Sequence, residues 1–147
     1  MPVEPDKRMV DFLHRHHVLT FATVNNNRPW CCQCFYTYID RLYGLGITSD
    51  RTTRHITEAL AQPEVAGSIV LESKVIGKLQ GIQFEGRLIE AAGDLLKEVR
   101  MAYLKRFPFA ILSGADLWFL ELSSMKMTDN RLGFGKKLYW KREQPVS

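Results

Sequence analysis

The chain has 147 residues, of which 46% are hydrophobic and 24% are charged, and its net charge is +4. This composition predicts one globular domain over residues 1–147 that folds without a metal ion or a disulfide. It excludes a membrane span, which needs about 20 consecutive apolar residues, and a long basic run that would mark a nucleic-acid surface. The modest positive charge agrees with an anionic small-molecule ligand.

Alternating apolar and polar residues predict a chain made mostly of strands. Residues 25–29, Asn-Asn-Asn-Arg-Pro, preset a bend or tolerate left-handed geometry, so they predict a turn within an antiparallel meander. Gly81 and Gly86 lie inside a long alternating segment and predict bends or bulges, which a small closed barrel needs. Strands are expected at residues 18–24, 30–39, 42–47, 65–72, 78–91, 117–126 and 138–142. Helices are expected at 4–17 and 93–107, with a short central helix that ends near residue 62.

The segment 45–56 joins the end of a strand to the central helix through a polar turn. Thr52 or Thr53 can cap this helix with a side-chain oxygen. Free N–H groups and the helix dipole favour an anion there, Arg54 can grip a phosphate in two places, and His55 adds a donor. The segment therefore predicts a phosphate site; the alternative is an ordinary capped helix with a solvated arginine and histidine.

Two groups of residues suggest a metal ion, but weakly. On a strand, Cys32 and Cys34 point one way, and Cys31 points the other. We interpret the Cys-x-Cys pair as small packing residues. His14 and His17 share a helix face, yet histidines at a helix end also complement the dipole, and we predict no metal site.

The positions of the cysteines also bear on location. All three lie within residues 31–34, too close together to cross-link distant segments. The charged segment 1–15 lacks the apolar core of a signal peptide. Both features predict a reducing, cytoplasmic location.

Four stretches carry a resemblance: Thr53-Arg54-His55, residues 80–86, residues 105–108, and residues 128–137 together with Trp140. With them the chain resembles the flavin-binding split-barrel superfamily, the fold of pyridoxamine phosphate oxidase. Within it, the chain is similar to the YhbP-like family of small bacterial proteins. The resemblance implies an α+β fold, mainly β with helices: an antiparallel split β-barrel of six to seven strands, flanked by about three helices.

The resemblance also implies a homodimer with FMN in the groove between the subunits. It assigns the FMN phosphate to the end of the third strand and the next helix, at Thr48, Ser49, Thr53, Arg54 and His55. It places the second strand beside the isoalloxazine ring, at Cys32, Gln33, Cys34 and Phe35. It further implies that Gln83 reaches the flavin from the partner subunit, and that Lys136, Lys137 and Trp140 cover the ring.

Two departures limit the functional assignment. His55 stands where many relatives carry lysine, and the C-terminal Arg-x-His substrate signature of pyridoxamine phosphate oxidases is missing. No general base stands out. We therefore expect an FMN-dependent oxidoreductase of unknown substrate or, alternatively, a non-catalytic flavin or haem carrier or sensor; the histidine cluster leaves haem open. We expect the dimer surface to include Trp118, Phe119 and the segment 82–88.

Overall fold

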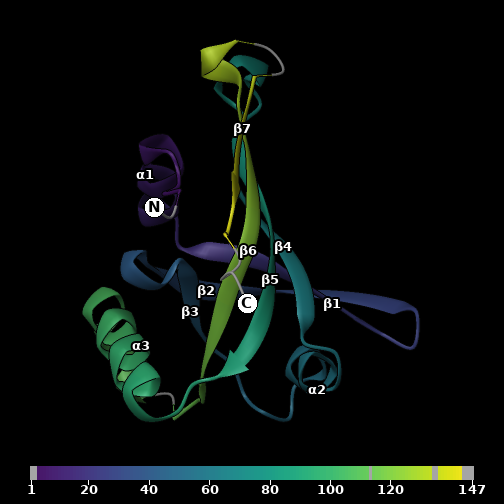
Figure 1. Cartoon of the computed structure of the whole chain (residues 1–147), viewed down its shortest axis with the longest axis vertical. Helices are drawn as coiled ribbons and strands as arrows, with labels where there is room; N and C mark the ends of the chain where they lie inside the picture. The colour runs from purple at the N-terminus through teal and green to yellow at the C-terminus, as the bar shows by residue number, and fades with distance from the viewer. Residues whose placement is uncertain (1–2, 113, 134–135, 144–147) are drawn as a thin grey trace.

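The computed structural model describes residues 3–112, 114–133 and 136–143 of the chain. Seven strands and three α-helices make up the described part, which has an α+β fold (Figure 1). The strands are β1 Val18–Asn25, β2 Arg28–Ile39, β3 Gly44–Thr48, β4 Glu64–Leu71, β5 Gln80–Glu90, β6 Leu117–Asp129 and β7 Lys137–Lys141. The helices are α1 Lys7–Arg15, α2 Arg54–Ala61 and α3 Gly93–Arg106.

The strands form one antiparallel sheet that closes on itself. Their order is β3-β2-β1-β4-β5-β6-β7, and β3 also pairs with β6. β6 changes partner along its length: residues 117–121 pair with β3, and residues 124–128 pair with β7. The first half of β6 thus closes a ring of six strands, while its second half, with β5 and β7, rises beyond the ring (Figure 1). This confirms the expected antiparallel split barrel of six to seven strands with three helices.

Local residues explain two bends in the sheet. The β1–β2 connection is a two-residue loop in which Asn26 and Asn27 have φ values of 52° and 60°, as predicted for left-handed turn residues. The β5–β6 register shifts between Glu85 and Gly86. A side chain at Gly86 would place its Cβ 2.6 Å from the carbonyl oxygen of Glu121, so glycine permits this close approach.

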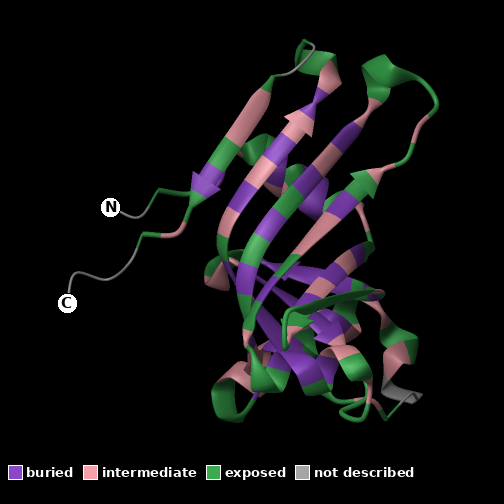
Figure 2. Ribbon diagram, turned by 90° about the vertical axis from the view of Figure 1, so that its right-hand side faces the viewer, coloured by how far each residue is buried: buried purple, intermediate pink, exposed green. Residues whose placement is uncertain are grey.

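The barrel interior is filled by the inward residues of the strands. Along β5, Ile82, Phe84 and Leu88 are buried, while Gln83 and Glu85 are exposed; Figure 2 shows this alternation along the long strands. Trp118 and Phe119 are also buried, at 0% and 3% exposure. The expectation that these apolar residues form a dimer surface is therefore wrong. Ile82, Phe84, Leu88 and Trp118 fill the interior of the closed barrel, and Phe119, on the other face of β6, is covered by α3.

Helices α1 and α2 add residues to the barrel core, whereas α3 packs against a second, smaller apolar cluster. α1 contributes Met9, Phe12 and Leu13, and α2 contributes Ile56 and Ala59. α3 packs on the outside of the barrel, where its residues Val99 and Tyr103 are buried, and Val99 joins a second cluster with Ile39, Ala91 and Phe119. Within the described residues, every helix is too short or too polar to span a lipid bilayer.

Several boundaries differ from those expected. α1 is shorter than residues 4–17 because the Asp6 carboxylate accepts the Arg8 N–H at its start and His16 is already extended. Leu42, expected to begin a strand, instead ends a 3₁₀ turn over residues 40–42, and Tyr43 then adopts φ 49°, so β3 begins at Gly44. β6 runs on to Asp129 because β5 pairs with it to that residue.

Candidate functional site

Hydrogen bonds on both sides hold the turn between β3 and α2. The Ser49 N–H donates to the Asp116 carbonyl at 3.1 Å, and Nε1 of Trp118 donates to the Ser49 carbonyl at 2.9 Å. On the other side, Oδ1 of Asp50 accepts two hydrogen bonds from Thr52, one from its backbone N–H at 2.7 Å and one from its hydroxyl at 2.6 Å. The turn is therefore a fixed platform between the barrel and the helix.

Thr53 stands at the N-cap position of α2, but its hydroxyl does not cap the helix. It donates to the Asp50 carbonyl at 2.8 Å and lies 3.3 Å from Nε2 of His55. The prediction that Thr52 or Thr53 caps α2 is wrong, since both hydroxyls bond within the turn. Among the described residues no side chain caps this helix, so its first N–H groups remain available to an anion.

Three of the residues predicted to bind phosphate do come together, and we call them the turn cluster: Ser49, Thr53 and His55. The Ser49 hydroxyl lies 2.6 Å from Nε2 of His55. Burial lowers the pKa of His55 below its ordinary value of 6.5, so the imidazole is neutral near pH 7. The cluster can bind an anion by hydrogen bonds rather than by charge.

The other two predicted phosphate residues make different contacts. The Thr48 hydroxyl lies 2.9 Å from that of Tyr103, in a hollow of about 400 Å³ beside α3. Nε of Arg54 donates to Glu58 at 2.7 Å, and its guanidinium lies over the ring of Trp30. The structure therefore does not join Thr48 or Arg54 to the turn cluster.

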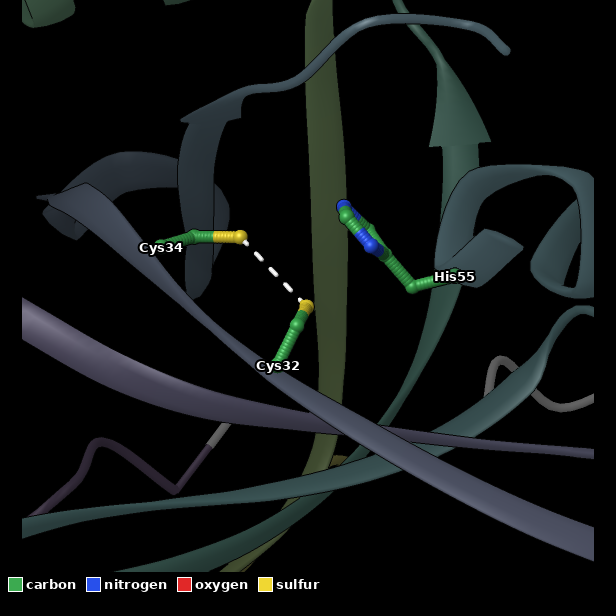
Figure 3. A group of neighbouring side chains, drawn as sticks. All are labelled: Cys32, Cys34 and His55. Carbon is green, nitrogen blue, oxygen red and sulfur yellow. Dashed lines mark hydrogen bonds between the residues drawn. The ribbon is translucent and has the colours of Figure 1, made fainter. Parts of the chain in front are cut away.

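The residues predicted on β2 divide between its two faces. Gln33 and Phe35 are exposed, whereas Cys34 is buried and Cys32 is half-buried. The two sulfur atoms are 3.9 Å apart, and both lie near the His55 ring (Figure 3). The hydrogen bond between the sulfurs lowers the pKa of Cys34 and raises that of Cys32. The inward face of β2 thus meets the start of α2.

On the outer face of the sheet, a groove of about 920 Å³ runs over β1, β4, β5, β6 and β7. We call it the outer groove. One row of side chains crosses it in register, each residue paired with the next across adjacent strands. This row is Gln33, Thr20, Ser68, Gln83, Lys126 and Tyr139. A floor of small residues, Ala22 and Ala66, lies beside it.

Of the residues predicted to contact the flavin, Gln83 lies in the middle of this groove. Trp140 also lines it, but its side chain is only 4% exposed and its Nε1 donates to the Val3 carbonyl at 2.8 Å. Lys136 is exposed and Lys137 begins β7. Phe134 and Gly135 of the 128–137 motif lie outside the described residues.

Sequence reasoning missed the other residues of the groove. Thr20, Ser68, Lys126 and Tyr139 sit at outward positions of strands that were correctly predicted. Their alternation was a usable signal, because every second residue of a half-buried strand faces outward. Which outward residues share one row depends on register, which the turns alone do not give for β1 and β4.

The histidines at the end of α1 do not form a cluster. Nε2 of His14 lies 2.7 Å from Asp40, the His16 ring packs on Phe12, and the His17 ring packs against Phe107. Within the described residues, the only group with metal-ligating geometry is a different one, Cys32 with Cys34 and His55.

Comparison with known proteins gives the family and supports the fold. A UPF0306 protein of Yersinia pestis bv. Antiqua (strain Angola) is 40% identical over 135 residues, which cover 92% of each chain. A heme-binding protein from Mycobacterium smegmatis superposes with a TM-score of 0.76 at 18% identity, over 95% of this chain and 59% of that one. An FAD-binding protein from Mesorhizobium loti superposes with a TM-score of 0.63 at 16% identity, over 86% and 95%.

At these identities the solved structures establish the fold alone. No protein-family model matches the sequence. The resemblance to the YhbP-like family and to the FMN-binding superfamily stays a prediction. The relative at 40% identity, matched over nearly the full length of both chains, decides the family: this chain belongs to the UPF0306 family.

Proposed function

We propose that the chain binds a flavin, FMN, as a homodimer, and that the bound flavin carries out hydride or electron transfer. The outer groove is the observation that carries this proposal. It is wide, shallow and open, and its row of side chains runs unbroken across the outward faces of neighbouring strands. Strands about 4.8 Å apart make this row roughly 24 Å long, enough for a tricyclic ring and part of a partner subunit.

The groups lining the groove suit a flavin chemically. The pyrimidine edge of isoalloxazine has both N–H donors and carbonyl acceptors. The Gln83 amide can donate and accept, the Ser68 and Thr20 hydroxyls can do the same, and Lys126 donates. Ala22 and Ala66 leave a flat floor for a planar ring. Bound there, a flavin would supply the redox chemistry, and these residues would orient it and exclude water.

A second subunit would complete the site. Val18, Phe35 and Val70 face outward near the groove and are 44%, 57% and 59% exposed, although they are large and apolar. Exposed apolar residues gathered on one face indicate a contact surface. We propose that a dimer covers this face and brings the turn cluster of one subunit to the groove of the other, where it holds the FMN phosphate.

Haem is the second candidate, because one of the structural neighbours is a heme-binding protein. Among the described residues that line the outer groove there is no histidine or cysteine. The lining groups of a type that ligates haem iron are the Tyr139 phenol and the buried Met125 thioether. A flavin needs no axial ligand, so the groove favours it over haem.

The test is an absorption spectrum of the freshly purified protein, followed by separate titrations with FMN, riboflavin and haem. We expect flavin bands in the near ultraviolet and the blue, and tighter binding of FMN than of riboflavin. Gln83→Ala should weaken both flavins about tenfold, the effect of one lost hydrogen bond, while the exposed Gln62→Ala should change neither. A Soret band with haem and no flavin binding would overturn the flavin proposal in favour of haem.

A further inference from the structure

We propose that Cys32, Cys34 and His55 form a zinc-binding site with an open fourth position, inside the barrel wall where β2 meets the start of α2. One ligand atom from each residue lies within 4.8 Å of the other two. Figure 3 shows the two sulfurs and the imidazole ring converging on one space from two separate elements. This site goes beyond the proposed flavin binding and uses the opposite face of β2; it shares His55 with the turn cluster, but its two cysteines belong to neither the turn cluster nor the outer groove.

The spacing of the sulfurs already suits a metal ion. Zinc binds thiolate sulfur at about 2.3 Å, so two sulfurs on a tetrahedral zinc lie about 3.8 Å apart. The two sulfurs of the chain are 3.9 Å apart. The pair therefore needs almost no rearrangement. A sulfur and a nitrogen on a tetrahedral zinc lie about 3.6 Å apart, and the ligand nitrogen of His55 lies within 4.8 Å of both sulfurs, so the imidazole needs to approach by about 1 Å at most.

A disulfide fits this pair less well. Alternate residues of a strand have Cα atoms about 6.6–6.8 Å apart, at the upper limit for a disulfide, whose usual separation is about 5.5–6 Å. Cys32 and Cys34 also pair with Phe21 and Leu19 of β1, so the backbone is held extended at both positions. A metal ion can bridge the sulfurs at their present distance, whereas a disulfide would have to pull the strand together.

The surroundings of His55 would orient it as a ligand. Its Nε2 is held by the hydroxyls of Ser49 and Thr53, so coordination through Nδ1 would keep both bonds. The ring of Phe21 packs edge-on against it at 5.9 Å. Support of this kind, from groups that do not touch the metal, fixes the ring orientation of metal-ligating histidines.

The ligand set indicates which ion would bind. Two soft thiolates with one imidazole suit zinc rather than calcium or magnesium, which prefer oxygen. Two thiolates also neutralise a divalent cation, which matters because Cys34 is only 8% exposed. Three protein ligands with a fourth position left open are typical of zinc sites that bind water or a substrate.

The experiment uses the full chain, reduced and freed of metal, titrated with Co²⁺ as a spectroscopic substitute for zinc. We expect thiolate-to-cobalt charge-transfer absorption in the near ultraviolet that Zn²⁺ abolishes, and competition with a chromogenic chelator then gives the zinc affinity. Cys32→Ser and His55→Asn should each weaken zinc more than about 100-fold, since losing an outer partner alone costs about 10–100-fold. Cys31→Ser, an exposed cysteine on the other face, is the matched control and should bind as the wild type does.

The inference is overturned if wild type shows no charge-transfer band, or if Cys31→Ser loses as much affinity as Cys32→Ser. Circular dichroism checks that each variant is folded, and Cys32 is chosen because it is less buried than Cys34. Flavin binding separates the two proposals: Cys32→Ser should keep FMN affinity, because its side chain does not line the outer groove. A wild-type protein that binds zinc but no flavin would refute the proposed function and leave the zinc site standing.

Discussion

The guanidinium of Arg54 lies over the indole ring of Trp30, with its Cζ 4.1 Å from the ring centroid. The same guanidinium donates to Glu58, which also accepts the Thr23 hydroxyl at 2.7 Å. These two hydrogen bonds hold the pKa of Glu58 below its ordinary value, and the bond from Arg54 has the larger effect. Arg54 therefore ties α2 to the β1–β2 hairpin.

This arrangement predicts that Arg54→Ala acts on stability rather than on phosphate binding. The variant should melt about 2–4 °C lower, because Glu58 loses its charged partner and Trp30 loses its stacked one. FMN and riboflavin should keep their wild-type affinities, measured by fluorescence titration. A loss of 10- to 100-fold for FMN alone would show instead that Arg54 swings to the phosphate.

If the dimer forms over the outer face of the sheet, a charged residue introduced there should dissociate it. Ser68→Arg puts a bulky charge in the middle of the row that crosses the outer groove. An unpaired charge buried at an interface costs several kcal/mol, so the dimer dissociation constant should rise at least about 100-fold. Sedimentation at micromolar concentration should show wild-type dimer and variant monomer.

The control for this experiment is Met101→Arg, on the exposed side of α3. It adds the same charge to a residue that is 74% exposed and lies away from the groove. It should remain dimeric. A wild-type protein that is monomeric throughout the concentration range would refute the dimer.

We predict that Arg142, just after β7, stabilises the fold through its hydrogen bonds to three backbone carbonyls. Its Nε donates to the Leu122 carbonyl at 2.7 Å, and its Nη2 donates to those of Leu42 and Tyr43 at 2.9 and 2.8 Å. Arg142→Ala removes all three donors and should lower the free energy of unfolding by about 1.5–3 kcal/mol. Arg142→Lys should restore only part of this, because an ammonium lacks the planar fork.

Urea denaturation measures both variants. The exposed Arg87→Ala on β5 serves as the control and should change the unfolding free energy by less than about 0.5 kcal/mol. Equal effects at both positions would mean that the contacts of Arg142 add nothing.

We predict that the protein loses stability in mild acid because the pKa of His16 is lowered in the folded state. Burial and the nearby charges of Arg15, His17 and Arg106 lower its pKa in the folded state from the ordinary 6.5. Below pH 6.5 the unfolded chain therefore binds more protons at this residue than the folded chain does, and stability falls as the pH drops toward the folded pKa. The urea midpoint should decrease between pH 7.5 and 5.5.

His16→Gln tests the assignment, since it removes the titrating group. Its urea midpoint should depend less on pH than that of wild type, whatever its value at pH 7.5. An NMR titration of the His16 ring checks the cause directly, and a midpoint near or above pH 6.5 would contradict it.

Local patterns in the sequence by themselves determined the strands, the direction of their side chains and two of the bends. Alternation separated Cys32 and Cys34 from Gln33, and Ile82 from Gln83, because side chains on a strand point to opposite faces in turn. Asn26, Asn27 and Gly86 were predictable because their conformations depend on their own backbone preferences and immediate neighbours.

Only the tertiary structure decided which of these residues meet. Closure of β3 onto β6 put Trp118 inside the barrel, and pairing of β1 with β4 joined Gln33 and Gln83 into one row. The start of α2 then brought His55 to the two cysteines and left Arg54 on Trp30. These contacts join segments far apart in sequence, so they depend on register and ring closure, which no local propensity encodes.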